Sequence, residues 1–229
     1  MDQMNRYAVY YVPPPGPFAE RAAAWLGRDL EKGAFVPHPD LPGLPRPIAD
    51  LTEVPRKYGF HATLRAPFRP AEGVTAQQIA TTVAQLATAL PPAVCAGLRP
   101  RDLHGFIALT PEGDTTGLEA LCAEVVKATN PLRAPLTEAE IARRRPDALS
   151  LRQRDLLALW GYPFVMDEFQ FHLTLTGPLD GPMMQGVLPV VQSHFAPVLP
   201  RPFVVRDLCV VGEDAAGRFH LISRHALTG

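Results

Sequence analysis

Two copies of one short string are the residues of this chain whose types and spacing suit chemistry. Residues 60–64 read Phe-His-Ala-Thr-Leu, and residues 171–175 read Phe-His-Leu-Thr-Leu. With only seven histidines in 229 residues, two chance copies of a Phe-His-x-Thr-Leu string are improbable. The repeat therefore indicates that the two segments share a function.

Apolar and polar residues alternate through both copies, which is typical of a strand that lays one face on a core. The polar face of each strand then presents a His and a Thr side by side. The pattern predicts these strands and pairs: residues 57–65 with His61 and Thr63, and residues 168–176 with His172 and Thr174.

Two imidazoles on facing strands suit the opening of a phosphodiester by in-line displacement. A base must take a proton from the attacking oxygen, and an acid must protonate the leaving oxygen on the opposite side. Histidine fills both roles near neutral pH without a metal, because its unperturbed pKa is about 6.5. We therefore predict His61 and His172 as an acid/base pair. Which is the acid stays open.

The negative charge that develops on phosphate oxygens needs hydrogen-bond donors nearby. The hydroxyls of Thr63 and Thr174 lie two residues beyond the histidines on the same predicted faces, and can donate to those oxygens. Arg65 follows on the first strand and offers a charged fork that matches phosphate. We predict these three as the phosphate-binding residues.

These motifs resemble those of the two-histidine (2H) phosphoesterase superfamily. Residues 57–64, 160–163 and 171–176 resemble its phosphonate-operon-associated branch in particular, and the resemblance covers nearly the whole chain. It implies an α+β, LigT-like fold. In that fold two antiparallel sheets, related by a pseudo-twofold axis and flanked by helices, surround a central cleft. It also implies catalysis by His61 and His172 on cyclic or 2′-5′-type phosphodiesters, with neither metal nor cofactor.

Composition limits the partners of the chain. A net charge of −1 and an isoelectric point near 6.7 give no field to hold a long nucleic acid, whereas a small phosphorylated substrate needs only local charge. The sequence contains no apolar run of membrane-spanning length and no signal-type start, so we expect a cytoplasmic protein without membrane contact. Three scattered cysteines in apolar surroundings, Cys95, Cys122 and Cys209, are expected to be reduced core thiols. The oligomeric state stays unknown.

One bilobed domain over residues 1–229 is expected, with the first motif in a half of about 1–112 and a helical insertion of about 131–163 before the second. Exchange of strands between the lobes is left open. The other predicted elements are strands over 6–12, 93–98, 105–110, 203–211 and 218–223, and helices over 18–30, 75–90, 117–128 and 183–195. The prolines of residues 35–55 predict an irregular loop, which either borders the cleft or wraps the surface.

The predicted insertion has its own local signals. Thr137 with Glu140 and Ser150 with Gln153 are capping-box patterns. The arginines of residues 143–145 suit the negative end of a helix, although contact with a phosphate remains open. Four residues around the motifs are predicted to line the cleft, with packing as the alternative role for the two aromatic ones: Lys57, Trp160, Tyr162 and Gln170.

Together these observations predict a metal-independent phosphoesterase that opens a cyclic phosphodiester of a sugar or nucleotide, in phosphonate metabolism. A non-catalytic protein that binds cyclic phosphates or nucleotides in the same cleft is one alternative. A metal-dependent phosphohydrolase is another, but only Glu168 shares a predicted face with a motif histidine. The remaining histidines have no matching Thr and are expected to be structural or surface residues: His38, His104, His194, His220 and His225.

Overall fold

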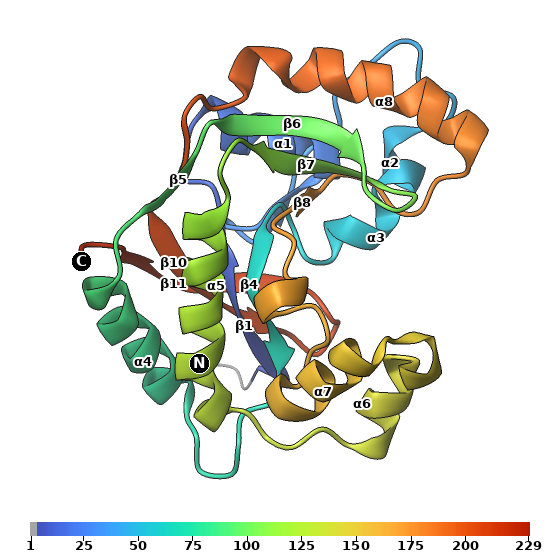
Figure 1. The fold of residues 1–229 in the computed structure, drawn as a ribbon. Helices are drawn as coiled ribbons and strands as arrows, with labels where there is room; N and C mark the ends of the chain where they lie inside the picture. Colours follow the sequence, from blue (N-terminus) through green and yellow to red (C-terminus); the bar gives the residue numbers. More distant parts are fainter. Residues whose placement is uncertain (1–3) are drawn as a thin grey trace.

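A seven-stranded antiparallel sheet, in the order β11-β10-β1-β4-β8-β7-β6, is the centre of the structure (Figure 1). The structure is a computed structural model that describes residues 4–229. The strands of this sheet are β1 (Arg6–Tyr11), β4 (Ala62–Phe68), β6 (Gly97–Asp102), β7 (Ile107–Glu112), β8 (Leu173–Thr174), β10 (Asp207–Glu213) and β11 (Phe219–Ala226). The predicted α+β fold is confirmed.

The pairing of β4 with β8 joins the two halves of this sheet. Its register sets Ala62 opposite Leu173, the central residues of the two repeated strings. The halves do not follow chain order. Strands β6 and β7 pair next to β8, whereas the C-terminal β10 and β11 return to pair beside β1. The two predicted sheets are thus the halves of one continuous sheet, and strands have been exchanged between them.

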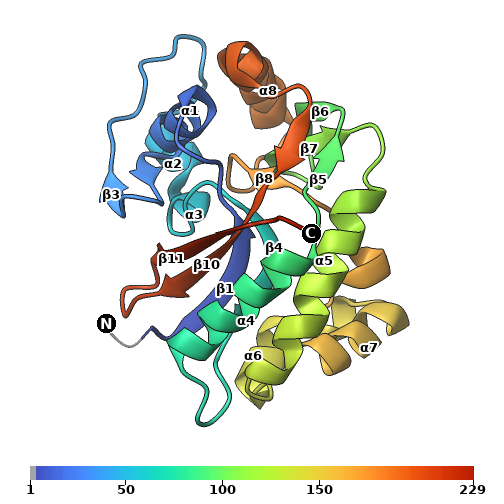
Figure 2. The same ribbon diagram turned by 90° about the vertical axis from the view of Figure 1, so that its left-hand side faces the viewer.

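Helices cover one face of the half-sheet formed by β11, β10, β1 and β4, and other helices flank the strands of the second half-sheet (Figure 2). Helix α4 packs on β10 and β11, α5 packs on β4, and α8 lies along β6. The α-helices are α1 (Pro17–Leu26), α2 (Ile48–Leu51), α3 (Glu53–Arg56), α4 (Ala76–Ala89), α5 (Thr116–Thr129), α6 (Glu138–Arg143), α7 (Leu151–Trp160) and α8 (Gly181–Phe195). Short elements complete the chain: strands β2 (Arg28–Asp29), β3 (Ala34–Phe35), β5 (Ala93–Cys95) and β9 (Phe203–Val205), and 3-10 helices η1 (Asn130–Leu132), η2 (Pro146–Ala148), η3 (Met166–Glu168) and η4 (Ala196–Val198).

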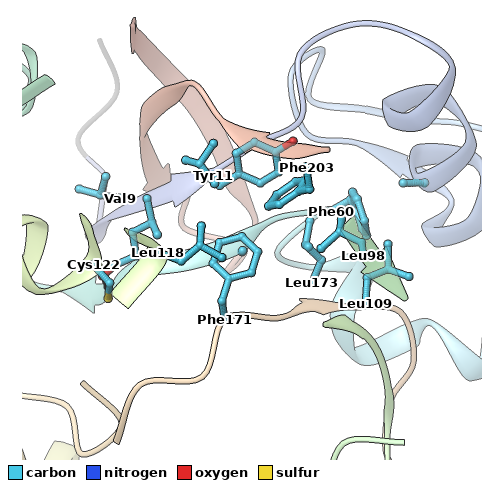
Figure 3. Close-up of a cluster of buried hydrophobic side chains, with 14 of the residues drawn as sticks. Val9, Tyr11, Phe60, Leu98, Leu109, Leu118, Cys122, Phe171, Leu173 and Phe203 are labelled. Carbon is cyan, nitrogen blue, oxygen red and sulfur yellow. Dashed lines mark hydrogen bonds between the residues drawn. The ribbon is translucent and has the colours of Figure 1, made fainter. Parts of the chain in front are cut away.

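The apolar residues of both repeated strings anchor in one main core. Phe60 and Phe171 lie there beside Leu173, Tyr11 and Phe203 (Figure 3). A smaller cluster on the opposite face of β1 contains Ala8, Tyr10, Val12, Cys209, Val211 and Phe219. The polar residues of the strings therefore point to the face that carries this smaller cluster. All three cysteines are free and buried, as the sequence predicts.

Both motif strands are shorter than predicted. The strand expected over 57–65 begins only at Ala62, because α3 and a turn at Gly59 precede it. Gly59 has φ +73°, and a Cβ built on it would lie 2.7 Å from the Cβ of Leu30, so only glycine fits this turn. The strand expected over 168–176 is reduced to Leu173–Thr174, since η3 ends at Glu168 and residues 169–172 and 175–176 have no regular secondary structure.

Two other predictions are wrong in detail. The first helix ends at Leu26 rather than residue 30, because Gly27 adopts the left-handed conformation that ends it. The proline-rich segment 35–55 is not wholly irregular. It contains α2 and α3, since proline is tolerated at a helix start and in the first turn, as at Pro55. Its irregular part lies against α8, where Pro45 approaches Gly186.

Two α-helices form within residues 131–163, the segment predicted as a helical insertion. Helices α6 and α7 begin at the two predicted capping boxes, in which Thr137 and Ser150 accept hydrogen bonds from the backbone. Gly161 ends α7 in the left-handed conformation. Within residues 4–229, no helix combines the length and apolar character that crossing a membrane requires.

The junction of the two sheet halves can be tested through Leu173. Its side chain is fully buried, so Leu173→Ala leaves a cavity and is expected to lower the free energy of unfolding by about 2–5 kcal/mol in urea titrations. Leu151→Ala, at a position that is 75% exposed, is the matched control and should change it far less. Equal unfolding midpoints for the two variants would show that β8 is not anchored in this core.

Candidate active site

The register of β4 and β8 brings the two motifs together. Ala62 and Leu173 are paired and face the core, with 1% and 0% of their surfaces exposed. Their neighbours therefore share the other face, where His61 stands opposite Thr174 and Thr63 stands opposite His172. The two histidines are diagonal neighbours, a relation that places residues about 7–8 Å apart. One small group can thus lie between both rings.

The ring of His61 is held by three contacts. Its Nδ1 lies 2.9 Å from the carbonyl oxygen of Gly59, which can only accept, so Nδ1 carries the proton and donates it. The unprotonated Nε2 is then free to accept, and it lies 3.2 Å from the hydroxyl of Thr63. The ring also stacks on Tyr10, with 3.8 Å between ring centroids. These contacts fix the tautomer that a general base needs.

The same device orients His172. Its Nδ1 lies 2.8 Å from the carbonyl oxygen of Gln170, again two residues earlier in the chain. Nδ1 is therefore the donor, and Nε2 is the nitrogen left for a ligand. The ring of Phe106 lies beside it at 5.9 Å between centroids. The two motifs thus repeat a side-chain geometry as well as a sequence.

Both imidazoles are neutral at pH 7 without a ligand. Burial, assisted by the proximity of His172, lowers the pKa of His61 to about 4. Burial also lowers the pKa of His172, against a smaller opposing effect of its bond to the Gln170 carbonyl. An anion bound between the rings would raise both pKa values by favouring the charged form. The site can therefore take up a proton together with a phosphate.

A cavity of about 530 Å³ begins at the motifs, and we call it the histidine cavity. Thr63 and His172 line it, whereas His61 and Thr174 do not, and Tyr162 and Gln170, both predicted to line the cleft, belong to its walls. Its other polar lining residues are His104, Gln153 and Glu168. Glu168 accepts a hydrogen bond from Gln153 at 3.0 Å. No group of three or more His, Cys, Asp or Glu side chains that could hold a metal occurs within residues 4–229.

Arg65 and two of the predicted lining residues lie elsewhere. The Arg65 side chain is buried and donates to the carbonyl oxygen of Trp160 at 2.9 Å, and both residues line a second cavity of about 200 Å³. Lys57 is exposed and follows the last residue of α3. It does not share a strand with His61, because β4 begins only at Ala62. A phosphate role for Arg65 beside Thr63 therefore stays a prediction.

Sequence reasoning missed several neighbours of the histidines. Tyr10 pairs with Thr63 across β1 and β4, a relation that only the strand register reveals. Tyr58 also lies near the His61 ring, at 6.1 Å between centroids. His104 is exposed, in keeping with the surface or structural role expected for it, but it also lines the histidine cavity. His104 lies in a turn, with φ 55°, and no sequence pattern around it predicts that it lines a cavity.

Comparison with protein families and curated proteins identifies relatives of this chain. The family described as "Protein of unknown function (DUF1045)" matches residues 63–220, which include the Thr of the first motif and all of the second. A protein of Janthinobacterium sp. (strain Marseille), named ribose 1,5-bisphosphate phosphokinase PhnN, is 35% identical over 222 residues. The match covers 94% of this chain but 49% of that protein, so the chain spans about half the length of the curated relatives it matches.

Solved structures are similar in outline and distant in sequence. A structure of E. coli LigT complexed with 3′-AMP is 13% identical with a TM-score of 0.48, and the match covers 99% of this chain and 100% of that one. A structure described as a phosphoesterase is 15% identical with a TM-score of 0.45, and the match covers 98% and 99% of the two chains.

Proposed function

We propose that this chain, which belongs to the DUF1045 family, is a metal-independent phosphoesterase that opens cyclic phosphodiesters by acid–base catalysis between His61 and His172. The observation that supports this most is the pairing of Ala62 with Leu173, which sets both motifs on one face of one sheet. The matching bonds from each Nδ1 to a backbone carbonyl give both rings the same tautomer.

The proposed reaction transfers two protons, one on each side of the phosphorus atom. One neutral imidazole takes a proton from water at Nε2 as the water oxygen bonds to phosphorus. The other imidazole, protonated at Nε2, donates its proton to the leaving sugar oxygen as the phosphorus–oxygen bond breaks. The products are a phosphomonoester and a free hydroxyl. Thr63 and Thr174, on the same face, donate hydrogen bonds to the non-bridging oxygens.

The electrostatics of the site fit an anionic substrate. With both pKa values lowered by burial, each ring is neutral at neutral pH before substrate binds, with its one proton at Nδ1 and none at Nε2. A phosphodiester anion between the rings favours protonation of one of them, which creates the acid only when it is needed. The second ring stays neutral because two adjacent positive charges repel each other.

The size and surroundings of the cavity favour a small phosphorylated sugar or nucleotide. A cavity of about 530 Å³ holds a small ligand, and Tyr162 and Phe106 line it with aromatic rings. The name of the matched relative refers to a ribose bisphosphate. We propose a cyclic phosphate of ribose type, in phosphonate metabolism, in keeping with the family resemblance of the motifs. The phosphokinase activity in that name belongs to a protein about twice as long and is not carried over.

Removal of either imidazole should abolish most of the turnover. His61→Ala and His172→Ala are each expected to lower kcat on 2′,3′-cyclic nucleotides by about 10²–10⁴-fold, the usual contribution of a general acid or base. The measurement is phosphorus NMR, which also shows which ester bond opens. His225→Ala, near the C-terminus, is the control and should retain normal turnover.

Two results would replace this proposal by its alternatives. Loss of activity after exhaustive chelation, restored by a divalent cation, would favour metal-dependent hydrolysis, with the histidines as ligands. Cyclic phosphates that bind but remain unopened after prolonged incubation would favour a binding protein.

The pH dependence of kcat/KM provides a second prediction, because this ratio reports the ionisation of the free enzyme. One imidazole must be protonated and the other neutral. Since both pKa values lie below the ordinary 6.5, the active fraction should rise as the pH falls from 8 to below 6.5, and decline again toward pH 4. Cyclic phosphodiesters do not titrate in this range. A maximum above pH 7.5 would contradict the assigned pair.

A further inference from the structure

Six arginines line the second cavity, which we call the arginine cavity: Arg6, Arg65, Arg69, Arg133, Arg143 and Arg144. Its volume is about 200 Å³, and it lies between β4 and the insertion that holds α6 and α7. A chain with a net charge of −1 thus places six of its 22 Lys and Arg residues around one small cavity.

Carboxylates neutralise only part of this charge. Arg6 pairs with Glu213, and Arg69 forms a two-point ion pair with Glu140, with both distances at 2.9 Å. The other four form no ion pair among the residues that the structure describes: Arg65, Arg133, Arg143 and Arg144. The free cavity therefore carries an excess of positive charge.

Arg65 is the most deeply buried of the four arginines without an ion pair. Its exposed surface is 1%, and its Nε is buried without a hydrogen-bond partner in the described structure. Its terminal nitrogens reach the carbonyl oxygen of Trp160 at 2.9 Å and the amide oxygen of Asn130 at 3.4 Å, both of them neutral groups. A buried cation without an anionic partner is costly, and proteins retain one where a ligand supplies the missing charge.

The two cavities are neighbours. Ala66 and Tyr162 line both of them. Arg65 lies two residues beyond Thr63 on β4, which is about 7 Å along the strand. The guanidinium of Arg144 lies over the ring of Tyr162, 4.8 Å from its centroid. A ligand with one phosphorus at the histidines can therefore place a second anionic group among the arginines.

We propose that the arginine cavity binds a terminal phosphomonoester of the substrate. The substrate class is then a cyclic phosphodiester that carries a separate phosphate several ångströms away, at the far end of its sugar. A guanidinium fork matches phosphate oxygens, and the fork of Arg144 makes no hydrogen bond among the described residues. Arg133 donates only to neutral oxygens, those of Asn130, Ala134 and Leu159 at 2.8–3.3 Å, so its charge, like that of Arg65, lacks an anionic partner. This assignment of substrate class rests on the proposed function, whereas the binding of a phosphomonoester by the cavity does not.

Direct binding tests the cavity without any catalysis. By isothermal titration calorimetry, ribose 5-phosphate should bind the wild-type chain, and Arg144→Gln should weaken the affinity about tenfold through loss of one charge-assisted contact. Arg145→Gln is the matched control, since it removes the next charge of the same run, at a residue outside the cavity lining. Arg133→Gln provides a second variant should Arg144→Gln fold poorly.

Four outcomes would overturn the proposal. If Arg144→Gln and Arg133→Gln both leave the affinity for ribose 5-phosphate unchanged, the arginine cavity does not bind it. The same follows if Arg145→Gln weakens the affinity as much as Arg144→Gln does. No binding to the wild type would do the same. Inorganic phosphate that binds as tightly as ribose 5-phosphate, with the same dependence on Arg144, would make this a site for free anions.

Turnover separates the two proposals. Adenosine 2′,3′-cyclic phosphate should have a kcat/KM about tenfold or more below that of its 5′-phosphorylated form, and Arg144→Gln should remove most of that preference. Equal values for the two substrates would overturn the substrate class while leaving the proposed function intact. Failure to open either substrate, with ribose 5-phosphate still bound through Arg144, would contradict the proposed function alone.

Discussion

The contact between β4 and β8 is the constraint on which the candidate site depends. A single register pair, Ala62 with Leu173, joins two halves of a sheet whose strands come from distant parts of the chain. Because side chains alternate along a strand, a slip of one residue would turn one His and its Thr into the core. The core prevents that slip, since Phe60 and Phe171 are buried on the opposite face.

A hydrogen bond from each histidine ring to a backbone carbonyl fixes which nitrogen faces the site. Each Nδ1 faces a carbonyl two residues earlier, so each ring has one orientation and one tautomer. The turn at Gly59, where a side chain would meet Leu30, sets the first of these carbonyls in place. Burial then lowers the pKa of both imidazoles, so both rings are neutral at pH 7 without a ligand.

The surroundings of the two motifs differ, although the motifs match. Aromatic rings from Tyr10 and Tyr58 lie beside His61, whereas His172 borders a cavity that leads toward the insertion. The segment that holds α6 and α7 supplies Arg143 and Arg144 to the arginine cavity.

The sequence alone predicts the paired motifs and the two helix caps, because these depend on short strings and short-range hydrogen bonds, whereas the strands that it predicts from alternation prove shorter in the structure. It does not predict what depends on register. Tyr10 opposite Thr63 is one example. The exchange of strands between the halves is another, since it is decided by long-range pairing. Alternation placed Arg65 on the histidine face, but packing against Phe68 and Trp160 draws its side chain into the neighbouring cavity.

The central claim is that both imidazoles reach one phosphorus atom from opposite sides. A crystal structure with vanadate and ribose tests it most directly, because vanadate bonded to a vicinal diol imitates the five-coordinate phosphorus of the reaction. We predict a vanadium between the rings of His61 and His172, with each Nε2 at about 3 Å, within hydrogen-bond reach of one apical oxygen. Vanadium held by one imidazole alone, or bound away from both, would contradict this account.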